Sequence, residues 1–247
     1  MAGSSAHKAL DILLLFSETD PQHTIESISN LTDMPISTAY RYLKVLCDKG
    51  FLEKADTGIY QLGLRFLELG RVASRSNRDL RLTILPSMKR IADQIVETVT
   101  LMRIFDKHAM CIESIEGKQV VRVSIEQGRM QPLYAGASSK VLVAALDESE
   151  WDAHLNMPVV QLTQNTITDV RQLKDELRRV RDQGFATSNG EIDQGGRAVA
   201  VPLKNRHNNV VAALSIEGPA FRMTDEIMPH YLALLRAEAS RIQRDLT

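Results

Sequence analysis

The chain of 247 residues is 44% hydrophobic and 25% charged, and its formal net charge is −1. These values are typical of a folded globular protein, and the length favours two domains over one. Because the first residues are polar and the apolar run at 12–16 is far too short for a signal peptide or a membrane span, we expect a cytoplasmic protein with no membrane partner.

The first 50 residues predict three helices, of which the last two form a helix-turn-helix. Residues 6–16 have an apolar face at helical spacing and predict the first helix. Thr24 is a suitable N-cap for a second helix over 25–31. After a four-residue break, Pro35 is well suited to open a third helix, which Gly50 would end.

The third helix has two chemically distinct faces. Its inward face carries Ala39, Leu43 and Leu46, at spacings of four and three. The opposite face carries hydroxyl and basic side chains and no carboxylate: Ser37, Thr38, Tyr40, Arg41 and Lys44. Such groups donate hydrogen bonds to phosphates and to base edges in a major groove. The pattern therefore predicts a DNA recognition helix.

Residues 51–62 predict two short strands joined by a turn at 56–58, which is the wing of a winged helix-turn-helix. Lys54 on this wing is placed to reach a phosphate. The candidate DNA contacts are Thr24, Ile36, Ser37, Thr38, Tyr40, Arg41, Lys44 and Lys54.

The charge of this region is unusual for a DNA-binding domain. Residues 1–75 contain eight Lys and Arg against nine Asp and Glu, so the region is not basic overall. Four of the cations lie on the third helix and the wing, at Arg41, Lys44, Lys49 and Lys54. We therefore expect modest affinity per protomer and a need for dimerisation.

A helix is predicted at 64–73, followed by a polar break at 74–77 that we take as the domain boundary. The next helix is predicted at 79–96, where Pro86 would kink it or mark a fresh start. Its apolar stripe comprises Leu80, Ile84, Met88, Ile91 and Ile95. Spacing alone does not decide whether this stripe is a dimer contact or ordinary core.

The rest of the chain mixes strands and helices. Strands are predicted at 98–105, 109–115, 119–125, 198–203 and 210–216. Helices are predicted at 138–146, at 168–183 and at 224–245, with Thr168 and Thr224 as the caps of the last two and Gly184 after the second. The short connections between strands favour an antiparallel sheet and an α+β fold.

The chain resembles the IclR-type bacterial transcriptional regulators along nearly its whole length. The matching stretches are Ala9-Leu10-Asp11-Ile12-Leu13, Ser37-Thr38-Ala39-Tyr40-Arg41, Tyr60-Gln61-Leu62-Gly63, Pro132-Leu133-Tyr134-Ala135, Asn165-Thr166-Ile167-Thr168 and Val211-Ala212-Ala213-Leu214-Ser215-Ile216 with Gly218-Pro219. The resemblance implies an N-terminal winged helix-turn-helix DNA-binding domain at 1–63 and a linker helix at 64–77. It implies a C-terminal GAF-like antiparallel-sheet domain at 78–247 for effector binding and oligomerisation.

The resemblance also implies partners and a ligand site. The partners are a double-stranded DNA operator, a small-molecule effector and a second copy of the chain, with a homotetramer as an extension of the homodimer. No cofactor is expected, and no residue is assigned a catalytic role. The implied ligand-binding residues are Ala137, Ser138, Ser188, Ala198, Ser215 and Glu217.

The first wall of this implied site is the helix start at Ala137 and Ser138, where the family binds carboxylates through backbone N–H groups. The alternative is that small residues here only allow close helix packing. On the opposite wall the chain departs from the family, which tends to have a hydroxyl at the position of Glu217 and often a thiol at that of Ala198.

Glu217 leaves three interpretations open. It pairs with Arg197 or Arg222 and is purely structural, or it accepts hydrogen bonds from ligand hydroxyls, or it binds an amino group. Glu191 and Asp193 are further candidate acceptors. The expected effector is a small polar carboxylate that carries hydroxyls, such as a sugar acid.

The alternative functions are an enzyme, a metal-dependent repressor and a winged helix used only for protein contacts. The chain lacks the nucleophile-elbow, dinucleotide, phosphate-loop and zinc-protease motifs, which argues against an enzyme. Its six histidines are scattered and its two cysteines, Cys47 and Cys111, lack metal-ligand spacing, which argues against a metal-dependent repressor and predicts buried, reduced thiols. A winged helix used only for protein contacts is the third alternative.

Overall fold

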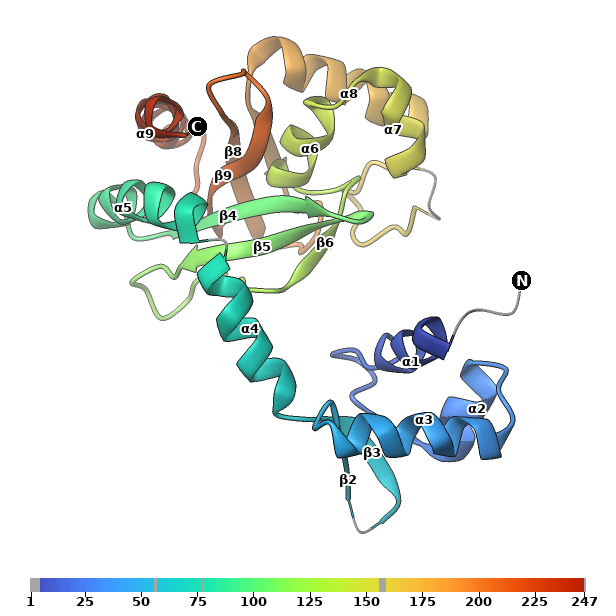
Figure 1. The fold of residues 1–247 in the computed structure, drawn as a ribbon. Helices are drawn as coiled ribbons and strands as arrows, with labels where there is room; N and C mark the ends of the chain where they lie inside the picture. The colour runs from blue at the N-terminus through green and yellow to red at the C-terminus, as the bar shows by residue number, and fades with distance from the viewer. Residues whose placement is uncertain (1–4, 56, 77, 156–158, 247) are drawn as a thin grey trace. The chain divides into compact units, whose positions relative to one another are not determined.

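The computed structural model describes residues 5–55, 57–76, 78–155 and 159–246, with the backbone alone at 74–76 and 78–81. The chain divides into two compact units, Met1–Arg78 and Asp79–Thr247 (Figure 1). In chain order, the helices and strands of the smaller unit are α1 Ser5–Leu13, β1 Gln22–Thr24, α2 Ile25–Leu31, α3 Ile36–Asp48, β2 Leu52–Lys54, β3 Ile59–Leu62 and α4 Arg65–Ser76.

The predicted helix-turn-helix is confirmed. Thr24 caps α2, and its side chain accepts a hydrogen bond from Ser27 N at 3.2 Å. The turn between α2 and α3 is closed by a bond from Met34 N to Ser29 O, and it places Asp33 in the left-handed region at φ 51°. Inward side chains of α1, α2 and α3 bury one small core.

The wing has one strand more than the sequence predicted. Strand β3 pairs antiparallel with β2 as expected, but its other edge pairs with β1, in the order β1-β3-β2. The sequence assigned 17–23 to a loop, because a three-residue strand has no periodicity to detect. Asp56 of the predicted turn lies outside the described residues, and Gly58 has φ 80°.

Gly63 fixes the junction between the wing and the recognition helix. A Cβ at this position would lie 2.3 Å from the Gly50 carbonyl oxygen, which is rigid backbone. We expect Gly63→Ala to destabilise the smaller unit by about 1–3 kcal/mol, as other over-packed sites do. Urea unfolding followed by circular dichroism measures this change.

Gly70→Ala is the matched control for this prediction. A Cβ at Gly70 in α4 would meet no atom within 4 Å, so we expect a gain of roughly 0.5–1 kcal/mol. The fluorescence of Trp151, the single tryptophan, reports the larger unit and should change in neither variant. A Gly63→Ala protein as stable as the parent would contradict the proposed backbone clash.

Helix α5 Arg78–Gln94 opens the larger unit, and the helices on either side of Asn77 correct one prediction and narrow another. Helix α4 continues to Ser76, so a break at 74–76 is wrong, while Asn77 lies outside the described residues. Helix α5 passes through Pro86 without a fresh start. Pro86 is exposed, so water can satisfy the carbonyl that its missing N–H leaves free.

The stripe on α5 belongs to the core of the larger unit. Its side chains at Ile84, Met88, Ile91 and Ile95 are buried against the sheet. The side chain of Leu80 lies outside the described residues. The described side chains of this stripe therefore form core contacts within one chain and are not free to form a dimer contact.

The larger unit is built on a six-stranded antiparallel sheet in the order β6-β5-β4-β9-β8-β7. Its strands are β4 Thr98–Phe105, β5 His108–Ile115, β6 Met130–Pro132, β7 Ala186–Asn189, β8 Gly196–Lys204 and β9 Val210–Pro219. The strand predicted at 119–125 is wrong, and β6 and β7 were missed. Side chains satisfy backbone carbonyls of 119–125 in place of a ladder: Thr98 donates to Val123 O, and Arg222 to Val121 O.

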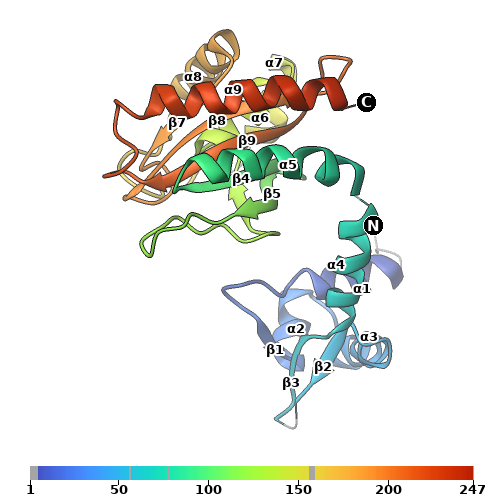
Figure 2. The ribbon, with the colours of Figure 1, turned by 90° about the vertical axis from the view of Figure 1, so that its left-hand side faces the viewer.

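Helices cover both faces of this sheet, which gives the predicted α+β fold (Figures 1 and 2). Helices α6 Ala137–Ala144, α7 Glu148–Leu155 and α8 Val170–Gln183 share one core with one face. Helices α5 and α9 Met228–Asp245 pack on the other face. The sequence did not predict α7.

Two predicted helix caps are wrong. Asp169, not Thr168, caps α8 and accepts a hydrogen bond from Gln172 N at 2.8 Å, although Gly184 ends that helix as predicted. Helix α9 begins at Met228, because Thr224 forms a preceding turn in which its carbonyl accepts from Ile227 N and Met228 N.

Of the two free cysteines, Cys111 is buried and Cys47 is half-buried.

Candidate functional site

The polar face of α3 is open to solvent. Ile36, Ser37, Tyr40, Arg41 and Lys44 are all exposed, and Thr38 is half-buried. Neither Arg41 nor Lys44 forms an ion pair with any residue that the structure describes. Pro35 provides no side-chain cap, so N–H groups of the first turn are available to a phosphate.

The wing places one further cation. Lys54 is exposed and lies across the ladder from Tyr60, with its ammonium 5.5 Å from the centre of that ring. The contact with the buried Tyr60 ring is made by the ammonium itself, and the Lys54 side chain remains exposed. Thr24 is exposed, but its hydroxyl oxygen already caps α2.

A cavity of about 640 Å³ lies in the larger unit at the start of α6. It brings together five of the six predicted ligand-binding residues, namely Ala137, Ser138, Ser188, Ala198 and Glu217. The sixth, Ser215, is fully buried and does not line the cavity. It lies behind the wall, where it accepts a hydrogen bond from Ser138 at 3.0 Å and donates one to Glu217 at 2.9 Å.

The start of α6 is held by a buried ion network. Gly136 precedes the helix at φ 91° and donates its backbone N–H to Glu191 Oε2 at 2.9 Å. The ammonium of Lys140, a fully buried side chain, lies 2.5 Å from Glu191 Oε1 and 3.2 Å from Glu176 Oε1. Lys140 was missed as a functional residue; its signal was a single cation within an otherwise apolar or small-residue helix.

Glu217 is buried among hydroxyl groups. Its Oε1 accepts hydrogen bonds from Thr100 at 2.8 Å and from Ser215 at 2.9 Å. Burial raises the pKa of the Glu217 carboxyl, and the two hydrogen bonds oppose that shift in part. Thr100 was not predicted, because only the β4–β9 register brings it beside Ser215.

The predicted ion pairs of Glu217 do not form. Arg197 pairs with Asp225, and Arg222 makes two hydrogen bonds to Glu97, at 2.6 and 2.9 Å. Both cations are therefore committed elsewhere, and the structural interpretation of Glu217 through Arg197 or Arg222 is wrong. The second oxygen, Oε2, has no hydrogen-bond partner among the residues that the structure describes.

Glu217 should make stability depend on pH. Because its pKa is raised on folding, the neutral carboxyl contributes stability that is fully present below the unfolded-state pKa and is lost as the pH rises through the folded-state pKa. We expect Glu217→Gln to raise the thermal midpoint at pH 8 and to have no such effect at pH 4. Thermal unfolding at both pH values measures this, and an equal effect at both would contradict it.

Exposed apolar side chains lie at the mouth of the cavity. Val121, Met130, Leu162 and Phe221 line it and are exposed. Val121 belongs to the 119–125 segment that was predicted as a strand. Polar groups thus lie at the inner wall and apolar side chains at the rim.

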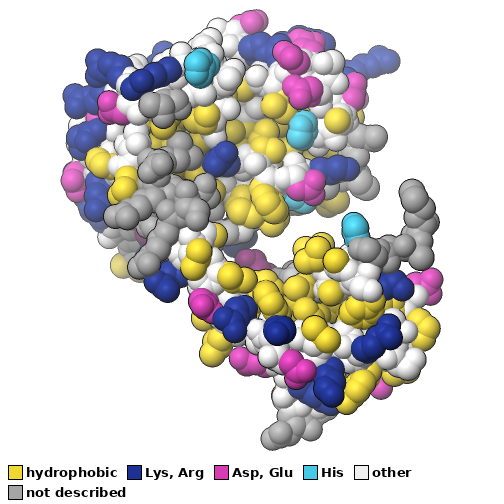
Figure 3. All heavy atoms as spheres, viewed as in Figure 1, with side chains coloured by type: hydrophobic (Ala, Val, Ile, Leu, Met, Phe, Trp, Pro, Cys, Tyr) yellow, Lys and Arg dark blue, Asp and Glu magenta, His cyan; other side chains and the backbone are white. Residues whose placement is uncertain are grey.

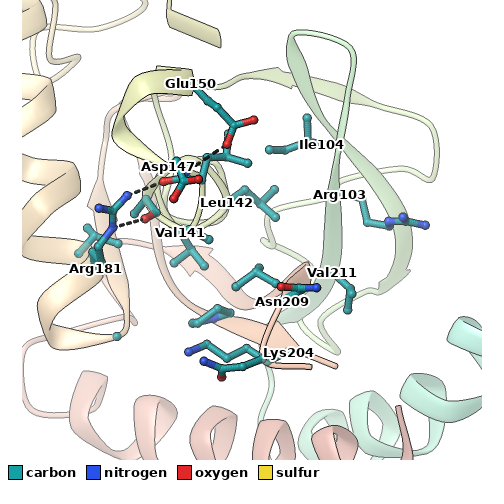
Figure 4. A pocket seen from close by; sticks show the side chains of 18 of the residues that line it. Arg103, Ile104, Val141, Leu142, Asp147, Glu150, Arg181, Lys204, Asn209 and Val211 are labelled. Atoms are coloured by element: carbon teal, nitrogen blue, oxygen red, sulfur yellow. Dashed lines mark hydrogen bonds between the residues drawn. The ribbon is translucent and has the colours of Figure 1, made fainter. Parts of the chain in front are cut away.

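A second cavity, of about 730 Å³, lies at the opposite end of α6 (Figure 4). Val141 and Leu142 of α6 line it, with Ile104 of β4 and Lys204 and Asn209 from the β8–β9 hairpin. No predicted ligand-binding residue lines this cavity. Helix α6 therefore has one end in each cavity.

Two features are absent from the described parts of the chain. No group of three or more His, Cys, Asp or Glu side chains able to hold a metal occurs among those residues. Within the same residues, no helix is both long and apolar enough to span a membrane.

Comparison with known families gives two matches. The profile described as the IclR helix-turn-helix domain matches residues 5–56. The profile described as the bacterial transcriptional regulator IclR C-terminal domain matches residues 72–244. Together they span nearly the whole chain.

Individual proteins agree with these matches over full length. The HTH-type transcriptional regulator KipR of Bacillus subtilis is 30% identical over 97% of this chain and 95% of its own. KdgR of Escherichia coli is 31% identical over 98% and 92%. A solved IclR homologue from Microbacterium hydrocarbonoxydans, complexed with 4-hydroxybenzoate, has a TM-score of 0.81 at 26% identity and covers 98% of this chain and 99% of its own.

Proposed function

The chain belongs to the IclR family of DNA-binding transcriptional regulators, and on that premise we propose that a small carboxylate effector controls its affinity for an operator. In this proposal, residues 1–63 read DNA, residues 64–77 link the units, and residues 78–247 bind the effector and form oligomers. The protein would act in the cytoplasm and not as an enzyme, in keeping with relatives that are transcriptional regulators.

The exposed face of α3 supports the DNA contacts. The proposed major-groove contacts are Ile36, Ser37, Thr38, Tyr40, Arg41 and Lys44, with Thr24 and Lys54 near the backbone phosphates. The unpaired guanidinium and ammonium on this face give it the positive charge that the unit lacks overall.

Exposed leucines support a homodimer as the active form. Leu10 of α1 and Leu14 just after it are 56% and 80% exposed, and Leu64 just before α4 and Leu67 within it are 70% and 72% exposed. Figure 3 shows apolar side chains gathered on the smaller unit. Apolar groups gathered in this way are typical of a protein interface, and a two-fold dimer presents two recognition helices to two half-sites. A homotetramer would extend the same arrangement.

The 640 Å³ cavity supports the effector. The uncapped first turn of α6 at Ala137 and Ser138 offers N–H groups to a carboxylate, while Ser188, Ala198, Ser215 and Glu217 provide or support the facing wall. The apolar mouth favours an acid with a hydrocarbon portion over a fully hydroxylated sugar acid. The solved relative complexed with 4-hydroxybenzoate agrees with this class of ligand.

Operator binding in the presence and absence of acids tests this function. The purified protein is titrated onto its own upstream DNA, with and without a panel of aromatic, aliphatic and sugar carboxylates. We expect one acid to change operator affinity by about 5–150-fold, the usual range of allosteric coupling. A specific operator complex that no acid alters would support the DNA-binding role and would contradict the proposal of a carboxylate effector.

A further inference from the structure

The two oxygens of Glu217 lie in different surroundings. Oε1 accepts from two buried hydroxyls, Thr100 and Ser215, whereas Oε2 has no hydrogen-bond partner in the described part of the chain. The residue lines the effector cavity and is only 8% exposed. One oxygen of a buried carboxyl group is therefore left for whatever occupies the cavity.

Glu217 is close to the proposed carboxylate position. Ser138, in the first turn of α6, donates to Ser215, and Ser215 donates to Glu217. An acid held by the N–H groups of this turn would thus share a cavity wall with a second carboxyl group, which two hydrogen bonds join to the Ser138 side chain. Two carboxylates this close in a buried site do not both stay ionised unless a cation lies between them.

Apart from the exposed Arg129, the cations at the cavity are already paired. Lys140 of α6 is held between Glu191 and Glu176. On β8, Arg197 pairs with Asp225, and in the 116–129 segment Arg122 pairs with Glu116. Each of these charges is thus already balanced by a carboxylate, although Arg197 Nε has no hydrogen-bond partner among the described residues.

The remaining titratable groups near Glu217 do not supply a charge either. Burial raises the pKa of Cys111, on β5, to about 12, so its thiol is neutral. Asp193 and Arg129, which also line the cavity, are exposed, so water screens them. The β4 neighbours of Glu217, Thr98 and Thr100, are uncharged.

We propose that the cavity binds a carboxylate effector together with one proton, which resides on Glu217 Oε2 and is donated in a hydrogen bond to the effector. The inference rests on the carboxylate effector of the proposed function. The proton comes from solvent, the carboxyl group becomes neutral, and the bonds from Thr100 and Ser215 to Oε1 are retained. A hydrogen bond from a neutral acid to a carboxylate is short and strong, so repulsion is replaced by attraction.

Calorimetry of effector binding tests the proton directly. The full chain is titrated at pH 7, 8 and 9 with 4-hydroxybenzoate, lactate and gluconate, each in two buffers with different enthalpies of ionisation. For the tightest-binding acid we expect uptake that approaches one proton per bound molecule, with Kd rising up to about tenfold per pH unit. The amide of the same acid should bind without proton uptake.

Two variants assign the proton to its residue. Glu217→Gln keeps an acceptor for Thr100 and Ser215 and offers a permanent N–H donor, so we expect binding with no proton uptake and no pH dependence. Glu126→Gln removes an exposed carboxylate that does not line the cavity and should leave the uptake in place.

The outcomes separate this inference from the proposed function. Acid binding without proton uptake, or uptake of unchanged size in Glu217→Gln, overturns the inference and leaves the effector site standing. Failure of every acid to bind overturns the inference and the carboxylate effector together.

Discussion

Replacing Arg41 and Lys44 together by alanine is expected to lower operator affinity by at least about 100-fold. Both side chains are exposed on α3 and form no ion pair within the described chain. The internal contact that the substitutions remove is that of the Arg41 guanidinium with the Tyr42 ring, whose centre is 5.7 Å away. A good base contact contributes about 1–3 kcal/mol, and a dimer loses each contact twice. Fluorescence anisotropy with labelled upstream DNA measures the change.

The matched control is Lys107→Ala. Lys107 is an exposed cation in the β4–β5 turn of the larger unit, so its loss changes net charge without touching α3. We expect wild-type operator affinity from this variant. The double variant should also bind with a weaker dependence on salt, because fewer counter-ions are released. Full operator binding by the double variant would favour a winged helix that serves only protein contacts.

The smaller unit was predictable because its contacts are local. Thr24, Pro35 and Gly50 mark helix ends by their own backbone preferences, and the apolar face of α3 follows from spacing alone. Strand β1 was not predicted, because it forms only through its pairing with β3. Short edge strands of this kind carry no signal of their own.

The errors in the larger unit have the same origin. The 119–125 segment has the composition of a strand, but hydrogen bonds from Thr98 and Arg222, distant in sequence, satisfy its carbonyls instead. At the start of α8, two adjacent residues could act as the N-cap. Asp169 does so, because it lies one residue nearer the first free N–H of the helix than Thr168 does. Composition cannot rank these competitors, because the outcome depends on tertiary contacts.

The sequence indicated which residues lie at the candidate site but not which hydrogen bonds join them. Five of the six ligand-binding residues that the resemblance implies line one cavity, since these positions follow from the family fold. The partners of Glu217 depend on register: Thr100 faces Ser215 across β4 and β9, whereas Arg197 and Arg222 find Asp225 and Glu97. Charge counting along a sequence cannot show that both arginines pair with other carboxylates.

Leu67→Glu is expected to convert the protein to a monomer and to lower operator affinity by at least about 100-fold. Leu67 is 72% exposed on α4, so a charge there costs little within one chain. If α4 packs against its copy, the same substitution buries two unpaired carboxylates in an apolar contact, which is strongly unfavourable. Analytical ultracentrifugation at the concentrations used for DNA binding measures the first effect, and anisotropy measures the second.

Val170→Glu is the matched control for the leucine substitution. It also places a carboxylate at an exposed apolar position, but in the first turn of α8, where negative charge is favourable. Retention of dimers and operator binding here, with loss of both in Leu67→Glu, would locate the dimer contact on α4. Dimers that persist in Leu67→Glu would instead assign pairing to the larger unit. In that case pairing of the smaller units would not explain why Leu10, Leu14, Leu64 and Leu67 are exposed, and these side chains would need another partner.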